Sequence, residues 1–137
     1  APEPAELGPG VFVGPAAVLT NGLRPRAVGP DGRPKGADDW TPVGVRVEEG
    51  ASLGARSVCV APVVVGRWAM VGAGAVVVAD VPDFALVVGS PARRIGWVDR
   101  TGERLEKDGV DADGEVGWRC AGTGERFVER EGRLHEL

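Results

Sequence analysis

The sequence of 137 residues contains no tyrosine, one methionine, one histidine and two cysteines, and aromatic residues make up only 5% of it. So few large rings argue against a globular core packed around aromatic side chains, whereas the 22 glycines suit thin, closely stacked coils. Cys59 and Cys120 do not form the pattern of a disulfide framework. The lone histidine, His135, cannot supply a metal site that needs several imidazole ligands.

Long apolar runs and a strong positive charge are also missing. No apolar stretch reaches the ~18 residues of a membrane span, because Arg67 interrupts the most hydrophobic region, and no basic and then apolar leader opens the chain. With 16 basic and 20 acidic residues the net charge is −4, and there is no basic stripe. We therefore expect a soluble, cytoplasmic protein that binds neither membrane nor nucleic acid.

What the sequence does contain is a repeat with a period of six between residues 47 and 82. A period of six matches neither the 3.6 of an α-helix nor the alternation of a hairpin strand, so each unit is one short strand plus a turn. Glycine follows the first residue of the unit at Gly54, Gly66 and Gly72, where we expect it to supply a positive φ in a tight turn. The units begin at Val47, Leu53, Cys59, Val65, Val71 and Val77, and a small or short residue follows four places later at Ala51, Ser57, Val63, Ala69, Ala75 and Val81.

Three such units per coil predict an all-β fold, a left-handed parallel β-helix in which the first residue of each unit points inward. The alternative is a buried strand pair rich in valine and alanine. The register continues backward through Leu19, Val13 and Leu7. An uncapped coil leaves strand edges open, and the chain starts at Ala1 with its only methionine at Met70, so we expect further coils upstream of this sequence.

The repeat is interrupted between Thr20 and Thr41. Residues 21–40 are rich in glycine and proline and are expected to form a loop ejected from the coil. Loops longer than about 12 residues in a compact protein are usually functional or disordered. Arg24 and Arg26 can meet anionic groups, and Trp40 is expected to anchor the returning chain on the coil; a solvated insertion is the alternative.

Several segments carry a resemblance to a known family. They are residues 10–15 (GVFVGP), 19–26 (LTNGLRPR), 49–56 (EGASLGAR), 65–76 (VGRWAMVGAGAV) and 80–97 (DVPDFALVVGSPARRIGW). They resemble the hexapeptide-repeat acyltransferases, and most of all the amino-sugar N-acetyltransferases of the UDP-2-acetamido-3-amino-2,3-dideoxy-glucuronate N-acetyltransferase type. The resemblance implies acetyl-CoA as the donor, a UDP-linked amino sugar as the acceptor, a role in surface-polysaccharide precursor synthesis, and a homotrimer with active sites between subunits.

Asn21, where the loop begins, is the residue that the resemblance places in the mechanism. Relatives that make O-acetyl esters carry a histidine base there. The Asn21 amide cannot act as a base, but it can orient a sugar amine that attacks the thioester unaided, with the departing thiolate as the final proton acceptor. A plain turn role is the alternative, because Asn-Gly is a strong turn pair. Arg24 and Arg26 are the expected substrate-binding residues.

The cofactor site is implied along the groove between adjacent subunits, with the pantetheine arm against the backbone of the last coils. Arg93 would meet the phosphates with its planar fork, and a surface charge is the alternative. Val78 and Ala79 stand where relatives often carry Thr-Lys or Thr-Arg, which removes one polar contact. For the small residues near position 73, corner packing is the alternative role. The expected cofactor-binding residues are Ala55, Ala73, Gly74, Val78, Ala79 and Arg93.

We expect residues 1–97 to form the β-helix domain and residues 98–137 a small C-terminal tail. The tail contains an internal echo, TGERL at 101–105 and TGERF at 123–127. A structural zinc site needs four ligands, and among cysteines and histidines the tail offers Cys120 and His135 alone. The tail therefore resembles a degenerate zinc ribbon without metal, either a small pair of β-hairpins or partly disordered.

Two other functions remain open. A sugar O-acetyltransferase shares the repeat, although the loop lacks the histidine that such enzymes use. A catalytically silent structural β-helix is the second, and binding of acetyl-CoA would separate it from both enzymes. A γ-type carbonic anhydrase is excluded, because its zinc needs three histidine ligands.

Overall fold

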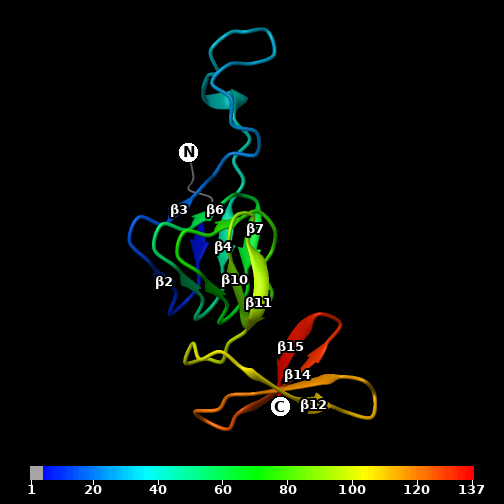
Figure 1. Cartoon of the computed structure of the whole chain (residues 1–137). Coiled ribbons are helices and arrows are strands. Elements are labelled where there is room, and N and C mark those ends of the chain that lie inside the picture. Colours follow the sequence, from blue (N-terminus) through cyan, green and yellow to red (C-terminus); the bar gives the residue numbers. More distant parts are fainter. Residues whose placement is uncertain (1–4) are drawn as a thin grey trace.

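The computed structural model describes residues 5–137. Its main body is a triangular parallel β-helix, from which a long loop extends on one side and a small antiparallel sheet packs on the other (Figure 1). The first face of the prism is made of β1 (Glu6–Leu7), β4 (Val45–Val47) and β7 (Val63–Val65). The second face contains β2 (Phe12–Val13), β5 (Ser52–Leu53), β8 (Met70–Val71), β10 (Ala85–Val88) and β11 (Arg93–Trp97), and the third contains β3 (Val18–Leu19), β6 (Val58–Cys59) and β9 (Val76–Val77).

The strands of each face are stacked in the register that the period of six predicts. Leu7 pairs with Val47, Val13 with Leu53, and Leu19 with Cys59, each in parallel. In the second and third coils all six inward positions are at most 1% exposed, and the small positions that follow them are at most 5% exposed. The prediction of a left-handed parallel β-helix is confirmed.

The first coil has a different environment. Leu7 and Val13 occupy inward positions but are 54% and 41% exposed, and Phe12 is 59% exposed. Among residues 5–137, no other coil packs on that side. The expectation of further upstream coils stays a prediction.

The role of the repeat glycines differs from the expectation. Gly54, Gly66 and Gly72 do not have positive φ; the left-handed residue comes two positions later, at Arg56 (φ 58°), Trp68 (φ 58°) and Gly74 (φ 73°). Glycine is needed at the earlier position because the next coil comes too close for a side chain. A Cβ on Gly54 would lie 2.5 Å from the backbone nitrogen of Ala73, where real Cβ contacts essentially never occur.

The coil ends where β11 turns back antiparallel on β10. The chain then forms an antiparallel meander of β12 (Glu106–Val110), β13 (Val116–Arg119), β14 (Arg126–Arg130) and β15 (Arg133–Glu136). This sheet packs on the first edge of the prism, between its first and second faces. Phe84 meets Phe127 edge to face with ring centroids 5.5 Å apart, and Trp97 Nε1 donates to Glu129 Oε1 at 3.0 Å. The tail and the β-helix therefore share one continuous core.

The ejected loop is an extended finger (Figure 1). At its root the Val43 N–H donates to the Asn21 carbonyl and the Leu23 N–H to the Thr41 carbonyl, each at 3.2 Å. On the returning side of the finger, after the turn at residues 29–32, lies a short 3₁₀ helix, η1 (Ala37–Asp39). Trp40 does not anchor the loop on the coil as expected: it is 45% exposed and lies under the Lys35 ammonium, 4.9 Å from the ring centroid.

Within residues 5–137 the structure contains no helix that is long and apolar enough to cross a membrane.

Candidate active site

The predicted site residues lie on two edges of the prism that flank its third face. The third edge, where the third face passes into the first, carries Asn21, Val78 and Ala79. The Thr20 N–H donates to the Cys59 carbonyl at 3.0 Å, and one coil further on the Val60 N–H donates to the Val77 carbonyl at 2.9 Å. Asn21 and Ala79 therefore occupy equivalent places two coils apart, which is roughly 10 Å along the stack.

The second edge, between the second and third faces, carries Ala55, Ala73 and Gly74. The Gly74 N–H donates to the Ala55 carbonyl at 2.8 Å, so these turns lie directly against each other. Ala73 and Gly74 are exposed, and no atom lies within 4 Å of where a Cβ on Gly74 would stand. The edge therefore presents backbone with very little side-chain cover, as a pantetheine arm would need.

Arg93 lies at the same second edge. The Val76 N–H donates to the Gly89 carbonyl and the Ala92 N–H to the Val76 carbonyl, which places residues 89–92 over the turn that contains Gly74. Arg93 begins β11 directly after this segment, and its side chain is exposed. Among residues 5–137 no carboxylate forms a salt bridge with Arg93, so its guanidinium can accept an anionic group.

Asn21 is held by its backbone at the root of the loop, and its side chain is exposed. Thr20, which the sequence analysis did not single out, contributes to this position. Its Oγ1 accepts the Ala61 N–H at 2.8 Å and so ties the residue before the loop to the next coil. A hydroxyl residue directly before the ejected segment was the available signal.

Arg24 and Arg26 follow on the exposed stem of the loop. In the described part of the chain neither arginine has a salt-bridge partner. The loop thus carries two guanidinium groups within five residues of Asn21 in the sequence.

The chain resembles proteins whose activities are known. It is 41% identical over 91 residues, 66% of its own length, to a dTDP-3-amino-3,6-dideoxy-alpha-D-galactopyranose 3-N-acetyltransferase from Aneurinibacillus thermoaerophilus. It spans 44% of that relative, which is less than half of its length. No family model matches the sequence.

Solved structures agree on the fold. AntD, an N-acyltransferase from Bacillus cereus seen with dTDP and coenzyme A, has a TM-score of 0.56 at 23% identity, over 71% of this chain and 54% of that one. A galactoside acetyltransferase in complex with coenzyme A has a TM-score of 0.55 at 19% identity, over 76% of this chain and 50% of that one. The chain is therefore similar in sequence to an amino-sugar N-acetyltransferase and shares the β-helix fold of the hexapeptide-repeat acetyltransferases. The resemblance stated from the sequence is confirmed.

In the single chain most of the predicted site residues lie on open surface, and Ala55 is half-buried. A depression of about 680 Å³ lies instead on the first face and first edge, lined by residues such as Arg67, Asp83 and Arg133, and it contains none of the predicted site residues.

Cys59 is not a nucleophile of this site. It is fully buried in the second coil, and burial raises the pKa of its thiol from an ordinary 9.0 to about 11. A thiol with that pKa is protonated at neutral pH and inert.

Proposed function

We propose that this chain is the β-helix part of an acetyl-CoA-dependent N-acetyltransferase that acts on the amino group of a nucleotide-linked amino sugar. The observation that carries the proposal is the 41% identity to an amino-sugar 3-N-acetyltransferase over 91 residues of this chain. The role proposed for it in the cell is the synthesis of surface-polysaccharide precursors.

The residues of the third edge suit an amine acceptor better than a hydroxyl. A hydroxyl must lose its proton to a base as it attacks, whereas a neutral amine can attack first. His135 is exposed on β15, paired with Val128 in the C-terminal sheet, on the opposite side of the β-helix from the loop (Figure 1). At the root of the loop stands Asn21 instead of a histidine. Its amide can orient the amine but cannot accept its proton.

The proposed reaction proceeds without a protein base. The neutral amine of the sugar attacks the thioester carbonyl carbon, a C–N bond forms, and the C–S bond then breaks. The coenzyme A thiolate takes the proton that the amine loses, so the charges balance. Asn21 holds the amino group in line, and exposed backbone of the second edge carries the pantetheine arm.

For the nucleotide, two pyrimidine diphosphates are candidates. The sequence resemblance favours a UDP-linked sugar. The Aneurinibacillus relative is an N-acetyltransferase of a dTDP-linked 3-amino sugar, and AntD has been seen with dTDP-4-amino-4,6-dideoxyglucose. In both cases Arg24 and Arg26 are proposed to meet the diphosphate with charge-assisted hydrogen bonds.

The proposed assembly is a homotrimer in which a neighbouring subunit supplies the second wall of each site. Exposed valines support it: Val60 and Val78 on the third edge and Val64 on the first face are 36%, 52% and 37% exposed. Closed cyclic symmetry buries such a surface on every subunit. Light scattering at micromolar concentration should give three times the chain mass, and a monomer would refute this assembly.

The function is tested by incubating the chain with acetyl-CoA and, in separate reactions, UDP-linked and dTDP-linked 3-amino and 4-amino sugars. Mass spectrometry should show one added acetyl group on the sugar in at least one reaction. Asn21→Ala should lower turnover on that sugar far more than it weakens acetyl-CoA binding measured by calorimetry. Asp38→Ala, in the 3₁₀ helix of the same loop, is the matched control and should leave both unchanged.

Two results would refute the proposal in different ways. If acetyl-CoA binds but no amino sugar is acetylated, amino sugars are excluded as acceptors, while acetyl-CoA remains the bound cofactor. If Asn21→Ala has full activity, the proposed acetyltransferase activity stands, but Asn21 has no part in its mechanism.

A further inference from the structure

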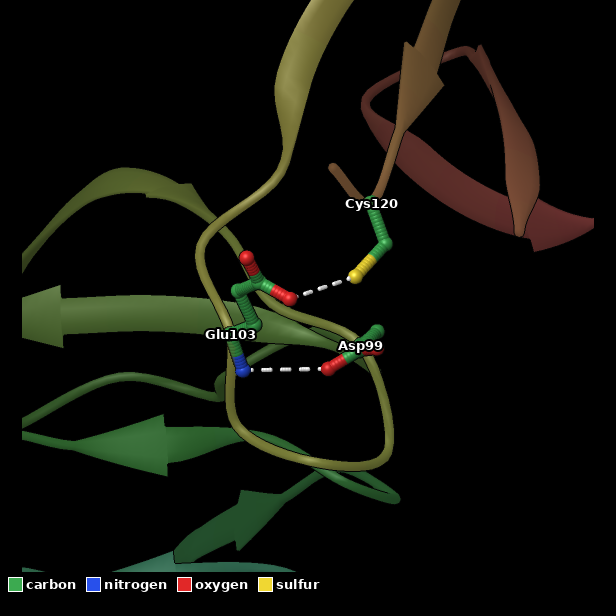
Figure 2. A group of neighbouring side chains, drawn as sticks. All are labelled: Asp99, Glu103 and Cys120. Carbon is green, nitrogen blue, oxygen red and sulfur yellow. Dashed lines mark hydrogen bonds between the residues drawn. The ribbon is translucent and has the colours of Figure 1, made fainter. Parts of the chain in front are cut away.

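Three potential metal ligands meet where the C-terminal sheet joins the β-helix. Asp99 and Glu103 lie in the turn after β11, and Cys120 lies in the turn between β13 and β14. Their side chains face one another across a small gap (Figure 2). One donor atom of each residue lies within 4.8 Å of the others. Cysteine and histidine spacing alone gives no sign of the two carboxylates.

Asp99 is the part of this cluster that indicates a ligand. It is 1% exposed, and one carboxylate oxygen, Oδ1, accepts hydrogen bonds from the Thr101 N–H at 2.9 Å, the Thr101 hydroxyl at 2.6 Å and the Glu103 N–H at 3.0 Å. The other oxygen, Oδ2, is buried with no hydrogen-bond partner. Burying a carboxylate oxygen without a partner is unfavourable, so Oδ2 would gain from contact with a cation or a hydrogen-bond donor. Three donors on Oδ1 also fix the orientation of the carboxylate, as outer-shell partners do at metal sites.

Cys120 and Glu103 complete the cluster. Cys120 is fully buried and its thiol donates to Glu103 Oε2 at 2.8 Å. Gly122 makes room for this carboxylate, because a Cβ at that position would lie 2.5 Å from Glu103 Oε2. Glu103 itself is exposed, so an ion can reach the cluster from solvent.

We propose that Asp99, Glu103 and Cys120 bind a divalent cation with affinity for sulfur, of which Zn²⁺ is the model. Bonds of about 2.0 to 2.3 Å in a tetrahedral ion place neighbouring ligand atoms roughly 3.3 to 3.8 Å apart, which is within the span of these donor atoms. On binding, the Cys120 thiol releases its proton to solvent, and a thiolate and two carboxylates surround the ion. A water molecule takes the fourth position.

The ion would join two turns that are distant in the sequence. One turn continues directly from the β-helix, where Gly102 packs against Met70 of β8 so closely that a Cβ would lie 2.9 Å from its Cε. The other belongs to the antiparallel sheet. Metal binding therefore fastens the sheet to the first edge of the prism, away from the proposed acetyltransfer residues.

A second acidic group in the same sheet lacks the buried, unpartnered oxygen that distinguishes Asp99. Asp111, Asp113 and Glu115 also lie close together in the turn between β12 and β13. Asp111 and Asp113 are exposed, and Glu115 forms an ion pair with Arg130. None of them has a buried oxygen without a partner, so this group provides the matched control.

The test is a calorimetric titration of Zn²⁺ into the full chain, purified with a chelator and a reductant that does not bind metal, followed by a Co²⁺ titration read by absorption. We expect one equivalent of Zn²⁺ to bind and Co²⁺ to give a thiolate-to-metal charge-transfer band. Cys120→Ser should abolish the band, and Glu103→Gln should weaken binding by at least about a hundredfold, beyond the loss of an outer-shell partner. Asp113→Asn, which removes an acid from the same sheet, should leave binding and band unchanged.

Glu103 is exposed, so Glu103→Gln keeps the experiment informative if Cys120→Ser does not fold. Zn²⁺ should also raise the melting temperature of the wild type and of Asp113→Asn, but not that of Glu103→Gln. The proposal is wrong if the wild type binds no tighter than Glu103→Gln, if the Co²⁺ band is absent, or if the band persists in Cys120→Ser. In the last case the only other thiol, Cys59, would be the ligand.

Discussion

Replacing Gly54 with alanine should be one of the most destabilising single-methyl changes in this β-helix. The added Cβ would meet three backbone atoms of the next coil: the Ala73 nitrogen at 2.5 Å, the Val71 oxygen at 2.6 Å and the Gly72 carbon at 2.7 Å. These backbone atoms cannot move away by a change of rotamer, as a flexible side chain can. The two coils must therefore separate by about 0.9 Å to restore an ordinary contact distance of 3.4 Å.

The magnitude follows from the hydrogen bonds at this contact. The Gly54 N–H donates to the Val71 carbonyl and the Gly74 N–H to the Ala55 carbonyl, both at 2.8 Å. Separation of the coils weakens both bonds, each worth about 0.5 to 1.5 kcal/mol, and leaves buried groups short of a partner at about 1 to 3 kcal/mol. We expect the free energy of unfolding to fall by about 3 to 5 kcal/mol, a large share of the roughly 5 to 15 kcal/mol that a domain has.

Gly74→Ala is the matched control, because it tests backbone conformation without crowding. Gly74 has a φ of 73°, yet a Cβ there would meet no atom within 4 Å. The left-handed conformation costs alanine about 1 to 2 kcal/mol, and the loss of unfolded-state entropy returns about 0.4 to 1 kcal/mol. The net loss should be about 1 kcal/mol.

Urea unfolding of the wild type and the two variants decides between these effects, provided that all three share one slope with denaturant. Gly54→Ala should lower the midpoint several times more than Gly74→Ala. If Gly74→Ala costs as much or more, then backbone conformation, and not the close approach of coils, is what these glycines provide.

Three further predictions concern the core and the cofactor. The folded pKa of about 11 for Cys59 lies above its ordinary 9.0, so the folded state keeps a proton that the unfolded state loses. Stability relative to Cys59→Val should be full well below pH 9 and should have fallen by about 2.3 kcal/mol at pH 11, measured by urea unfolding at each pH. Phe127→Ala should lower the free energy of unfolding by about 3 to 5 kcal/mol, because the ring is fully buried against Phe84, and an unchanged urea midpoint would show that the tail does not support the core. Arg93→Ala should raise the Michaelis constant for acetyl-CoA roughly ten- to a hundredfold with saturated turnover nearly unchanged, while Arg119→Ala should change neither; equal values for both variants would remove Arg93 from the cofactor site.

The period of six was sufficient to predict the fold, because every coil of a β-helix requires inward-facing apolar residues at the same positions. Val47, Leu53 and Cys59 could be assigned to the interior from their spacing, and the structure buries all three completely. The break after Thr20 located the ejected loop for the same reason, since residues that do not fit the coil must leave it. Both are local properties, so they can be read from the spacing of residues along the chain.

The sequence did not reveal what depends on the distance between coils. Gly54 and Gly72 were expected to supply backbone freedom, but the reason for glycine at Gly54 is the Ala73 backbone one coil away. The pairing of Arg56 N–H with the Pro15 carbonyl, 3.0 Å apart, shows how the turns of successive coils meet at an edge. Such contacts join residues far apart in the chain, and a repeat pattern does not measure how closely its units stack.

The C-terminal segment depends even more on tertiary packing that the sequence pattern does not show. Its echo of TGERL and TGERF suggested two related turns, but the sequence alone could not show that the sheet would pack on Phe84 or that Cys120 would donate to Glu103. Glu103 and Cys120 are 17 residues apart, and neither stands in a motif that would link them. Only the closing of the sheet onto the prism brings the thiol, the two carboxylates and the unpartnered Asp99 oxygen together, because burial and proximity are properties of the packed chain.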